Sequence, residues 1–232
     1  MSVFVMSDEY SYITEAIKSY GNTIIESDSI LCFNKPEQRH IDMQMLKIDN
    51  DIFILKEAKT LYGKISKLPY NIHLTETDTI GKYPYCTKLN ALYLNNKLFC
   101  REKSLDIKVR QCCKNNNIEI VNVNQGYTAC STAVISDKAA ITADMTIYKS
   151  LNQNDIDVLL ISAGNITLEG YNYGFIGGAC TMIDSTNLCF FGDITLHPDY
   201  EIIQKFCIIH NVNIISNLQG RPLVDIGGAI KL

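Results

Sequence analysis

The sequence predicts an α/β protein, specifically a five-bladed β/α propeller in which five ββαβ units follow one another around a closed ring. Three observations indicate this fold. A short apolar pattern that ends in an acid recurs five times. A segment with apolar residues at helical spacing and then a β-rich run follow each copy. Every copy except the first is also preceded by a second extended segment.

The repeated pattern reads FVMSD, FILKE, LFCRE, AITAD and CFFGD, and its final acids are Asp8, Glu57, Glu102, Asp144 and Asp193. Successive acids are separated by 49, 45, 42 and 49 residues. Dividing 232 residues by five gives about 46, which is within the usual length of a repeat unit. The repeat therefore covers the whole chain.

The elements follow in a fixed order within each unit. We expect helices over 13–20, 58–65, 105–113, 147–151 and 203–210. We expect strands after them over 23–27, 70–74, 118–123, 157–161 and 212–216. The extended segments before the acids cover 42–48, 89–94, 131–135 and 180–183, and short polar turns join each of them to the next strand as a hairpin.

The first unit lacks its opening strand, and residues 228–232 form an unattached strand-like segment that would supply it. We therefore expect one domain over 1–232. Its units are approximately 229–232 plus 1–35, 36–83, 84–126, 127–174 and 175–228. An open α/β sheet is the alternative, but a hairpin in every unit and the split first unit argue against it.

Charge, cysteine spacing and the lengths of apolar runs exclude several classes of partner and cofactor. The net charge is −4 and no basic stripe is present, so nucleic acid is not an expected partner. Nine cysteines without a CxxC pair or a zinc-type spacing predict neither a disulfide framework nor a metal site, and no phosphate-binding pattern predicts a cofactor. The N-terminal segment has no apolar run long enough for a signal peptide or a membrane span, so we expect a cytoplasmic protein. Nothing indicates an oligomeric state.

Several segments resemble an uncharacterised bacterial family with the guanidino-group-modifying-enzyme fold, called pentein. They are NQGYTACSTAVISDKAAITAD (124–144), GYNYGFIGGAC (170–180), HPD (197–199) and PLVDIGG (222–228). The resemblance implies the same five-bladed architecture. Characterised penteins include arginine deiminases, dimethylarginine hydrolases and amidinotransferases, which use a Cys nucleophile, a His and carboxylates around an axial channel. Another branch is a ribosome anti-association factor without catalysis.

The chain departs from the deiminase pattern at two places. The Gly-rich segment that precedes the nucleophilic Cys in those enzymes corresponds to 225–230 here and contains no Cys. Their His motif near the start of the fifth unit corresponds to 177–180, which contains no His. Any enzymatic chemistry must therefore use other residues or be absent.

We select Cys130, His40 and Asp42 as candidate catalytic residues. Cys130 directly precedes a predicted strand, where a thiol would face the channel and be activated by a neighbouring base. His40 and Asp42 alternate along a predicted strand, so both side chains would point to one face, as an oriented general base requires. The alternatives are a small buried cysteine without chemistry and a polar pair near a loop.

A second set of polar residues is predicted to bind substrate. The set is Asp144, Asp193, Gln125, Tyr173, His197 and Asp225. The five repeat acids suggest a ring of carboxylates for a guanidinium or amine, although an acid between a strand and a helix is also favoured as a cap. Tyr173 belongs to a Gly- and Tyr-rich loop over 165–178, which would form either a lid or a packed connection.

Two functions of different class remain. One is a hydrolase or transferase that acts on a guanidino or related amino compound in the axial channel, with a small cation as its partner. The other is a non-catalytic binding module, which the missing standard Cys and His favour.

Overall fold

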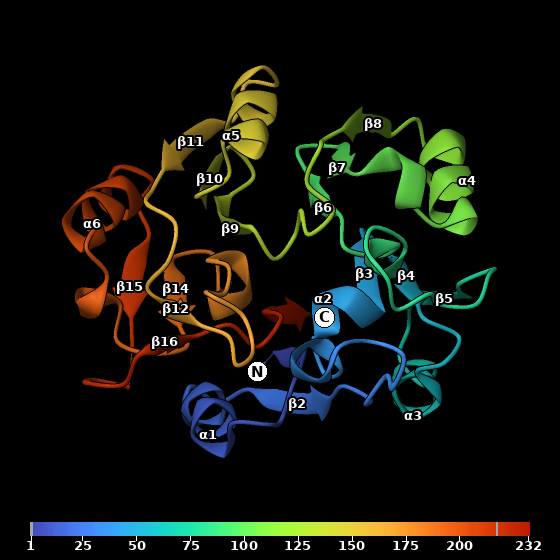
Figure 1. Ribbon diagram of the computed structural model, residues 1–232, viewed down its shortest axis with the longest axis horizontal. Coiled ribbons are helices and arrows are strands. Elements are labelled where there is room, and N and C mark those ends of the chain that lie inside the picture. The colour runs from blue at the N-terminus through green and yellow to red at the C-terminus, as the bar shows by residue number, and fades with distance from the viewer. Residues whose placement is uncertain (1, 217) are drawn as a thin grey trace.

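The computed structural model describes residues 2–216 and 218–232, and its architecture is α/β with small mixed sheets. Five sheets have three strands each, and β12 (Ile166–Thr167) and β16 (Leu223–Val224) form a two-stranded sheet. Figure 1 shows the five three-stranded sheets spread around the middle of the molecule, with a helix on the outer side of each. None of the helices among the described residues has the length and apolar character required to cross a membrane.

Every three-stranded sheet has the same internal order. Its first strand is antiparallel to the middle strand, and the middle strand is parallel to the third. The first strands are β17 (Ala229–Lys231), β3 (Met45–Ile48), β6 (Leu92–Leu94), β9 (Thr132–Ser136) and β13 (Cys180–Met182). The middle strands are β1 (Val3–Met6), β4 (Asp51–Ile54), β7 (Lys97–Cys100), β10 (Ala139–Thr142) and β14 (Asn187–Phe190). The third strands are β2 (Thr23–Glu26), β5 (Asn71–Leu74), β8 (Glu119–Asn122), β11 (Asp157–Leu160) and β15 (Asn213–Ile215).

One long helix connects the middle strand to the third strand of each sheet. These helices are α1 (Ser11–Ser19), α3 (Lys59–Ile65), α4 (Ile107–Asn115), α5 (Met145–Asn152) and α6 (Tyr200–Ile209). A parallel pair of strands needs such a crossover because the chain must return from the end of one strand to the opposite end of the sheet before the next strand begins. The helices and third strands expected from the sequence are confirmed, with shifts of a few residues at their ends.

The C-terminal strand completes the first sheet. In the pairing of β17 with β1, Phe4 lies opposite Lys231 and Met6 lies opposite Ala229. The expectation that the end of the chain supplies the missing strand is therefore confirmed. At the hairpin between β6 and β7, Asn95 and Asn96 have φ values of 51° and 57°. Asparagine tolerates these left-handed values, which suit the tight turns that join adjacent antiparallel strands.

The strand expected over 42–48 is partly wrong. Residues Ile41–Gln44 form the short helix α2, and the strand begins only at Met45. Tertiary contacts decide this local structure, because the Gln44 side chain donates from Nε2 to the carbonyl of Asp28 (2.7 Å) and to that of Gln38 (2.9 Å). His40 and Asp42 consequently do not alternate along a strand. His40 lies at the N-cap of α2, and Asp42 lies inside the helix.

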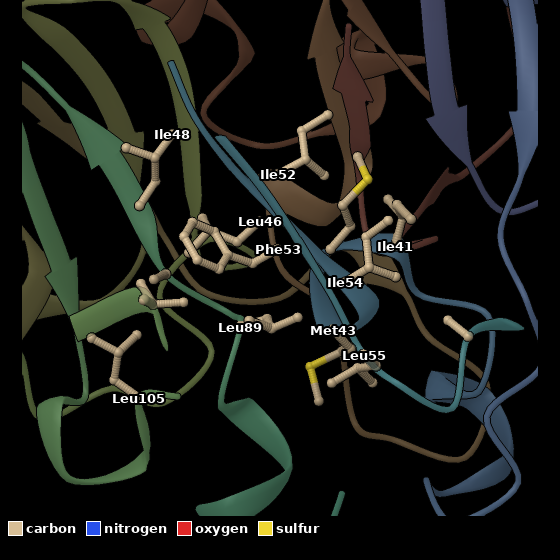
Figure 2. Close-up of a cluster of buried hydrophobic side chains, with 14 of the residues drawn as sticks. Ile41, Met43, Leu46, Ile48, Ile52, Phe53, Ile54, Leu55, Leu89 and Leu105 are labelled. Carbon is tan, nitrogen blue, oxygen red and sulfur yellow. The ribbon is translucent and has the colours of Figure 1, made fainter. Parts of the chain in front are cut away.

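The hydrophobic core includes a cluster around β4. Figure 2 shows Ile52 and Ile54 on one side of this strand and Phe53 on the other, as expected for a strand that is buried on both faces. Phe53 is 1% exposed. Side chains from α2 and from the segments before β6 and α4 complete the cluster, so the core holds the segment that carries Asp42 in place.

Candidate functional site

Segments that lead into the first strands form the centre of the candidate site. Asp42 precedes β3, Asn90 precedes β6, Cys130 precedes β9 and Asp225 precedes β17. The fifth such segment, Gly177–Ala179, is a single 3-10 turn before β13. Backbone hydrogen bonds join these segments, because Gly178 donates to the carbonyl of Cys130 (3.0 Å) and accepts from Ile226 and Gly228. Residues far apart in the sequence are thus brought together at equivalent positions of the repeat.

Cys130 and Asp42 are in direct contact. The thiol of Cys130 donates to Oδ2 of Asp42. Asn90 supports the pair, since its Nδ2 lies 3.1 Å from Cys130 Sγ and its Oδ1 accepts from the backbone N–H of Ala129 at 2.9 Å. Cys130 is 2% exposed, and Asp42 Oδ1 is buried without a hydrogen-bond partner among the described residues. An unpaired buried carboxylate oxygen is costly, so this position is suited to a ligand that donates hydrogen bonds.

His40 and Asp225 complete the cluster. His40 Nδ1 lies 3.9 Å from Asp225 Oδ1, and both side chains are almost fully buried. Asp225 is oriented by the backbone, because its Oδ1 accepts from Gly227 (2.9 Å) and its Oδ2 accepts from Phe175 (2.8 Å). We refer to His40, Asp42, Cys130 and Asp225 as the central cluster. The structure therefore brings together all three residues selected as catalytic and one of those selected for substrate binding.

Two glycines permit this close packing. Gly227 has φ = 76°, and a Cβ added there would lie 2.4 Å from the Cβ of His40. A Cβ on Gly178 would lie 1.8 Å from Asp225 Oδ1. Real Cβ atoms do not approach other heavy atoms so closely, so the backbone can come this near the two side chains only where glycine stands.

Burial controls the protonation of the cluster. It raises the pKa of the Cys130 thiol well above its usual value, and the charges of Asp42 and Asp225 raise it further. Burial also raises the pKa of Asp42, and Asp225 adds to this shift while the hydrogen bond from Cys130 opposes it. The surroundings of Cys130 thus keep its thiol protonated, and they do not provide the activation by a neighbouring base that we expected.

Replacing Asp42 by asparagine is expected to raise the free energy of unfolding near pH 8 by about 1–3 kcal/mol, because asparagine places no charge in this buried position. The folded-state pKa of Asp42 is raised above the unfolded value. The folded protein therefore binds this proton more tightly, and the stabilising effect of the proton is lost as pH rises above the unfolded pKa. Urea unfolding at several pH values measures the effect, which should shrink toward about pH 4.

The exposed Asp155 provides a control, because its replacement by asparagine should change stability little at either pH. If the Asp42→Asn variant is equally stable or less stable than the wild type near pH 8, then burial does not penalise this carboxylate.

The central cluster also offers metal-binding atoms. One donor atom each from His40, Asp42 and Cys130 lies within 4.8 Å of the other two. An imidazole, a carboxylate and a thiolate together form a ligand set that zinc accepts. The sequence predicts no metal here because the donors come from two separate units and have no recognisable spacing.

Two cavities lie near the cluster. The larger has a volume of about 570 Å³ and is lined by residues from all five first strands. Asp42, Ala129 and Gly177 line it at the segments that lead into these strands, and Asp49 and Asp137 line it at the hairpins. We call this cavity the strand-lined channel. In Figure 1, α2 and the C-terminal strand lie near the middle of the molecule.

The smaller cavity has a volume of about 100 Å³ and lies beside the loop over 165–178. Gln125, Asp144 and Tyr173 line it, so the structure brings these three predicted substrate-binding residues together. Gln125 Nε2 donates to Asp144 Oδ2 (3.1 Å), and Asp144 Oδ1 caps α5 by accepting from Thr146 and Ile147. These hydrogen bonds lower the pKa of Asp144 despite the opposing effect of burial, so the carboxylate stays charged. Ser131 Oγ also lines this cavity and has no partner among the described residues.

The other two predicted binding residues have local structural roles. Asp193 accepts from the backbone N–H groups of Thr195 (3.0 Å) and Gly220 (2.7 Å), which orients the turn around it. His197 Nδ1 accepts from the backbone of Asp199 (3.1 Å) immediately before α6, and burial lowers the pKa of this histidine. The contacts of Asp193 match the capping alternative that the sequence leaves open for the repeat acids.

Three of the repeat acids have polar partners of their own. Asp8 pairs with Arg39, Glu57 accepts from Thr79, and Glu102 pairs with Arg110. Each of the five repeat acids therefore has a polar partner of its own, which for Asp144 and Asp193 includes the backbone N–H groups that they cap.

Sequence reasoning missed Asn90 and Glu37. Glu37 is 4% exposed, and its Oε1 accepts from the hydroxyls of Tyr127 (3.0 Å) and Tyr171 (2.7 Å). Tyr171 belongs to the loop over 165–178, so these contacts fasten that loop to the segment before α2. The repeat register would have identified Asn90, because it precedes β6 as Cys130 precedes β9. No local pattern marks Glu37.

Comparison with known proteins identifies a family and a fold. Residues 4–230 match a protein family described as "Family of unknown function (DUF6873)". No curated protein matches the chain in sequence.

Solved structures with similar folds include a DDAH from Pseudomonas aeruginosa complexed with citrulline. It has a TM-score of 0.59 and 8% identity, and the match covers 99% of this chain and 98% of that one. An agmatine deiminase from C. jejuni has a TM-score of 0.54 and 10% identity, with 99% and 92% covered. An amidinotransferase of saxitoxin biosynthesis from Microseira wollei has a TM-score of 0.55 and 10% identity, with 89% and 75% covered. At these identities the similarity is one of fold.

Proposed function

The chain belongs to the family of unknown function DUF6873 and has the fold of pentein enzymes, and from this premise we propose that it is a hydrolase or transferase acting on a guanidino or related amino compound. The observation that carries the proposal is the buried contact of Cys130 with Asp42, beside His40. A nucleophile, an acid–base group and carboxylates for a cation then lie in one site.

We propose further that the five sheets are the blades of one closed propeller over residues 1–232, with the unit boundaries expected from the sequence. The repeated strand order and the pairing of β17 with β1 support this arrangement. The strand-lined channel is then the axial channel of the propeller.

The proposed first step forms a covalent intermediate. The thiol proton of Cys130 passes to His40, and Sγ attacks the central carbon of the guanidinium group. His40 then returns this proton to the departing nitrogen as the carbon–nitrogen bond breaks, which leaves a thiouronium group on Cys130. Attack by water releases a urea derivative in a hydrolase, and attack by an amine transfers the amidino group in a transferase.

A cationic substrate also supplies the activation that the surrounding side chains do not provide. A guanidinium group beside Asp42 and Cys130 favours the ionised form of both side chains, because it places a positive charge in a buried environment. Hydrogen bonds from the guanidinium nitrogens would satisfy the unpaired Asp42 Oδ1. The substrate cation therefore lowers the pKa of the thiol that attacks it.

The other selected residues have supporting roles in this proposal. Asp225 lies 3.9 Å from His40, so in this proposal its charge stabilises the imidazolium that forms when His40 takes the thiol proton. Gln125, Asp144 and Tyr173 form a separate polar wall at the smaller cavity, which no residue of the central cluster lines, so we propose no contact between them and the substrate cation. Asp193 caps a turn and His197 accepts from the backbone of Asp199, so we assign them no direct contact with substrate.

A non-catalytic binding module is the second candidate function, and one observation favours it. The thiol of Cys130 is buried and its pKa is raised, which is the usual state of an unreactive cysteine. In this alternative the same carboxylates hold a small cation without covalent chemistry.

Trapping of the covalent intermediate tests the proposal. The protein is incubated with a series of guanidino compounds, quenched in acid and digested, and the mass of the Cys130 peptide is measured. We expect an added amidino group on this peptide, together with release of ammonia or an amine. The peptide containing Cys112 serves as the internal control, because Cys112 lies on α4 away from the central cluster. The enzymatic function is contradicted if no compound gives either the adduct or a released amine.

A further inference from the structure

We propose that the ligand reaches the central cluster from the hairpin side of the molecule, through the strand-lined channel, and that this channel is the binding site for its stem. The inference deepens the proposed function, because it takes Cys130 and Asp42 as the reacting end of the site. It assigns a direction of approach that the identity of the central residues alone does not determine.

The two cavities differ in size and in their relation to the cluster. The strand-lined channel has about 570 Å³, which lies within the usual range for small-molecule sites, and Asp42 of the central cluster lines it. The cavity beside the loop over 165–178 has about 100 Å³, and none of the four cluster residues lines it. The larger space therefore reaches the cluster where the smaller one does not.

Contacts on the loop side close the opposite approach. Tyr171 and Tyr127 donate to the buried Glu37, and Phe175 donates from its backbone to Asp225. The ring of Tyr127 also packs between those of Tyr83 and Phe175, with centroid separations of 5.7 Å and 5.9 Å. A ligand arriving from this side would have to break these contacts.

The lining of the channel indicates the chemistry of its occupant. Leu46, Leu92, Ala133 and Ile230 provide apolar surface along its length. Lys47, Lys231, Asp49 and Asp137 provide charges of both signs at its outer end, and Tyr93 donates to Asp49 at 2.9 Å. This arrangement suits an elongated organic cation whose charged head reaches Asp42, whose aliphatic stem packs on the apolar walls and whose polar far end lies near the rim.

Lys47 and Lys231 lie close enough at the rim to affect each other. Burial lowers the pKa of Lys47, and the charge of Lys231 lowers it further while Asp49 opposes the shift. Lys231 itself donates to the carbonyl of Ile183 at 2.8 Å. The channel lining thus includes two lysines and two carboxylates, so a far end that carries either an anionic or a zwitterionic group finds charges of opposite sign there.

Chemical modification of Cys130 tests the direction of approach without requiring turnover. Iodoacetamide and the cationic reagent 2-bromoethylamine both alkylate thiols, with a thioether formed, halide released and the thiol proton lost to the buffer. The rate at Cys130 is measured by peptide mass spectrometry, with the exposed Cys32 as internal standard.

Two variants are designed to fill the channel and one to fill the smaller cavity. Ala229→Phe and Val134→Trp place bulk at two half-buried positions on different walls of the channel. Ala143→Phe places bulk in the smaller cavity and is the matched control. We expect each channel variant to slow alkylation of Cys130 by about tenfold or more, and the control to change it by less than about twofold. Thermal unfolding identifies any variant that has lost the fold, and the second channel variant then carries the test.

Unchanged alkylation in a folded channel variant, or slowing in Ala143→Phe alone, would overturn the proposed direction of approach. Failure of the proposed function gives a different result. In that case no guanidino compound is turned over, while the channel variants still protect Cys130 from both reagents.

Discussion

Replacing Cys130 by alanine is expected to lower the turnover of a guanidino substrate by about 10⁴-fold or more, while the dissociation constant of that substrate changes by only a few fold. The variant removes the atom that forms the covalent bond, and removal of a nucleophile abolishes most of the rate acceleration of a covalent mechanism. Asp42 and Asp225 remain to hold the cation. Steady-state kinetics and isothermal calorimetry on the same preparation measure the two effects.

A matched control replaces Cys112 by alanine. Cys112 lies half-buried on α4, so its loss should leave turnover unchanged. Survival of turnover in Cys130→Ala would exclude the nucleophilic role of Cys130. Binding of a guanidino compound by the wild type without turnover would instead identify the chain as a binding module.

Replacing Gly178 by alanine is expected to lower the free energy of unfolding by about 3 kcal/mol or more. The added methyl group would lie 1.8 Å from Asp225 Oδ1 and 2.4 Å from its carboxyl carbon. Asp225 cannot move away without losing its hydrogen bonds from Phe175 and Gly227. The backbone of Gly178 also bonds to the segments that precede β9 and β17, so the strain would spread to the centre of the molecule. Urea unfolding measures the loss.

Gly63 provides the control for this substitution. It lies inside α3, and a Cβ there would meet nothing within 4 Å. Replacing Gly63 by alanine should therefore stabilise the protein by about 0.5–1 kcal/mol, because alanine loses less backbone entropy in a helix. If both variants have the same stability, Gly178 does not pack directly against the carboxylate of Asp225.

The sequence predicts the elements of this protein well because each unit carries the same apolar pattern. A helix such as α5 and a strand such as β11 have periodic apolar residues, and Asp144 marks the helix start, where it caps the first turn. The repeat also predicts that the last strand pairs with the first, since one unit has no opening strand without it.

The errors concern positions where tertiary contacts override local pattern. Residues 41–44 alternate as a strand would, yet Gln44 bonds to two backbone carbonyls of another segment and holds these residues in α2. This helix brings Asp42 to Cys130, 88 residues away in the sequence. Glu37 could not be predicted as buried, because its partners Tyr127 and Tyr171 come from distant loops.

Burial is the property of the site that the sequence conveys least. The residues next to a cysteine in the sequence do not determine whether its thiol is ionised. The pKa of Cys130 is raised by burial and by side chains that are distant in the sequence. The repeat places Asp42, Cys130 and Asp225 before the first strands of their units, whereas the helix that carries Asp42 and the protonation state of the thiol could not be predicted from it.

The pairing of β17 with β1 also has a consequence for biosynthesis. As the ribosome extends the chain from its N-terminus, β1 pairs with β2 early but keeps one unprotected edge, because Phe4 meets Lys231 only when more than two hundred further residues have been made. Exposed strand edges are sites of aberrant association between nascent chains. Joining 229–232 ahead of Val3 in a circularly permuted gene would shorten this interval to the synthesis time of a single hairpin, and the rate of refolding should increase because the sequence separation of these contacts falls.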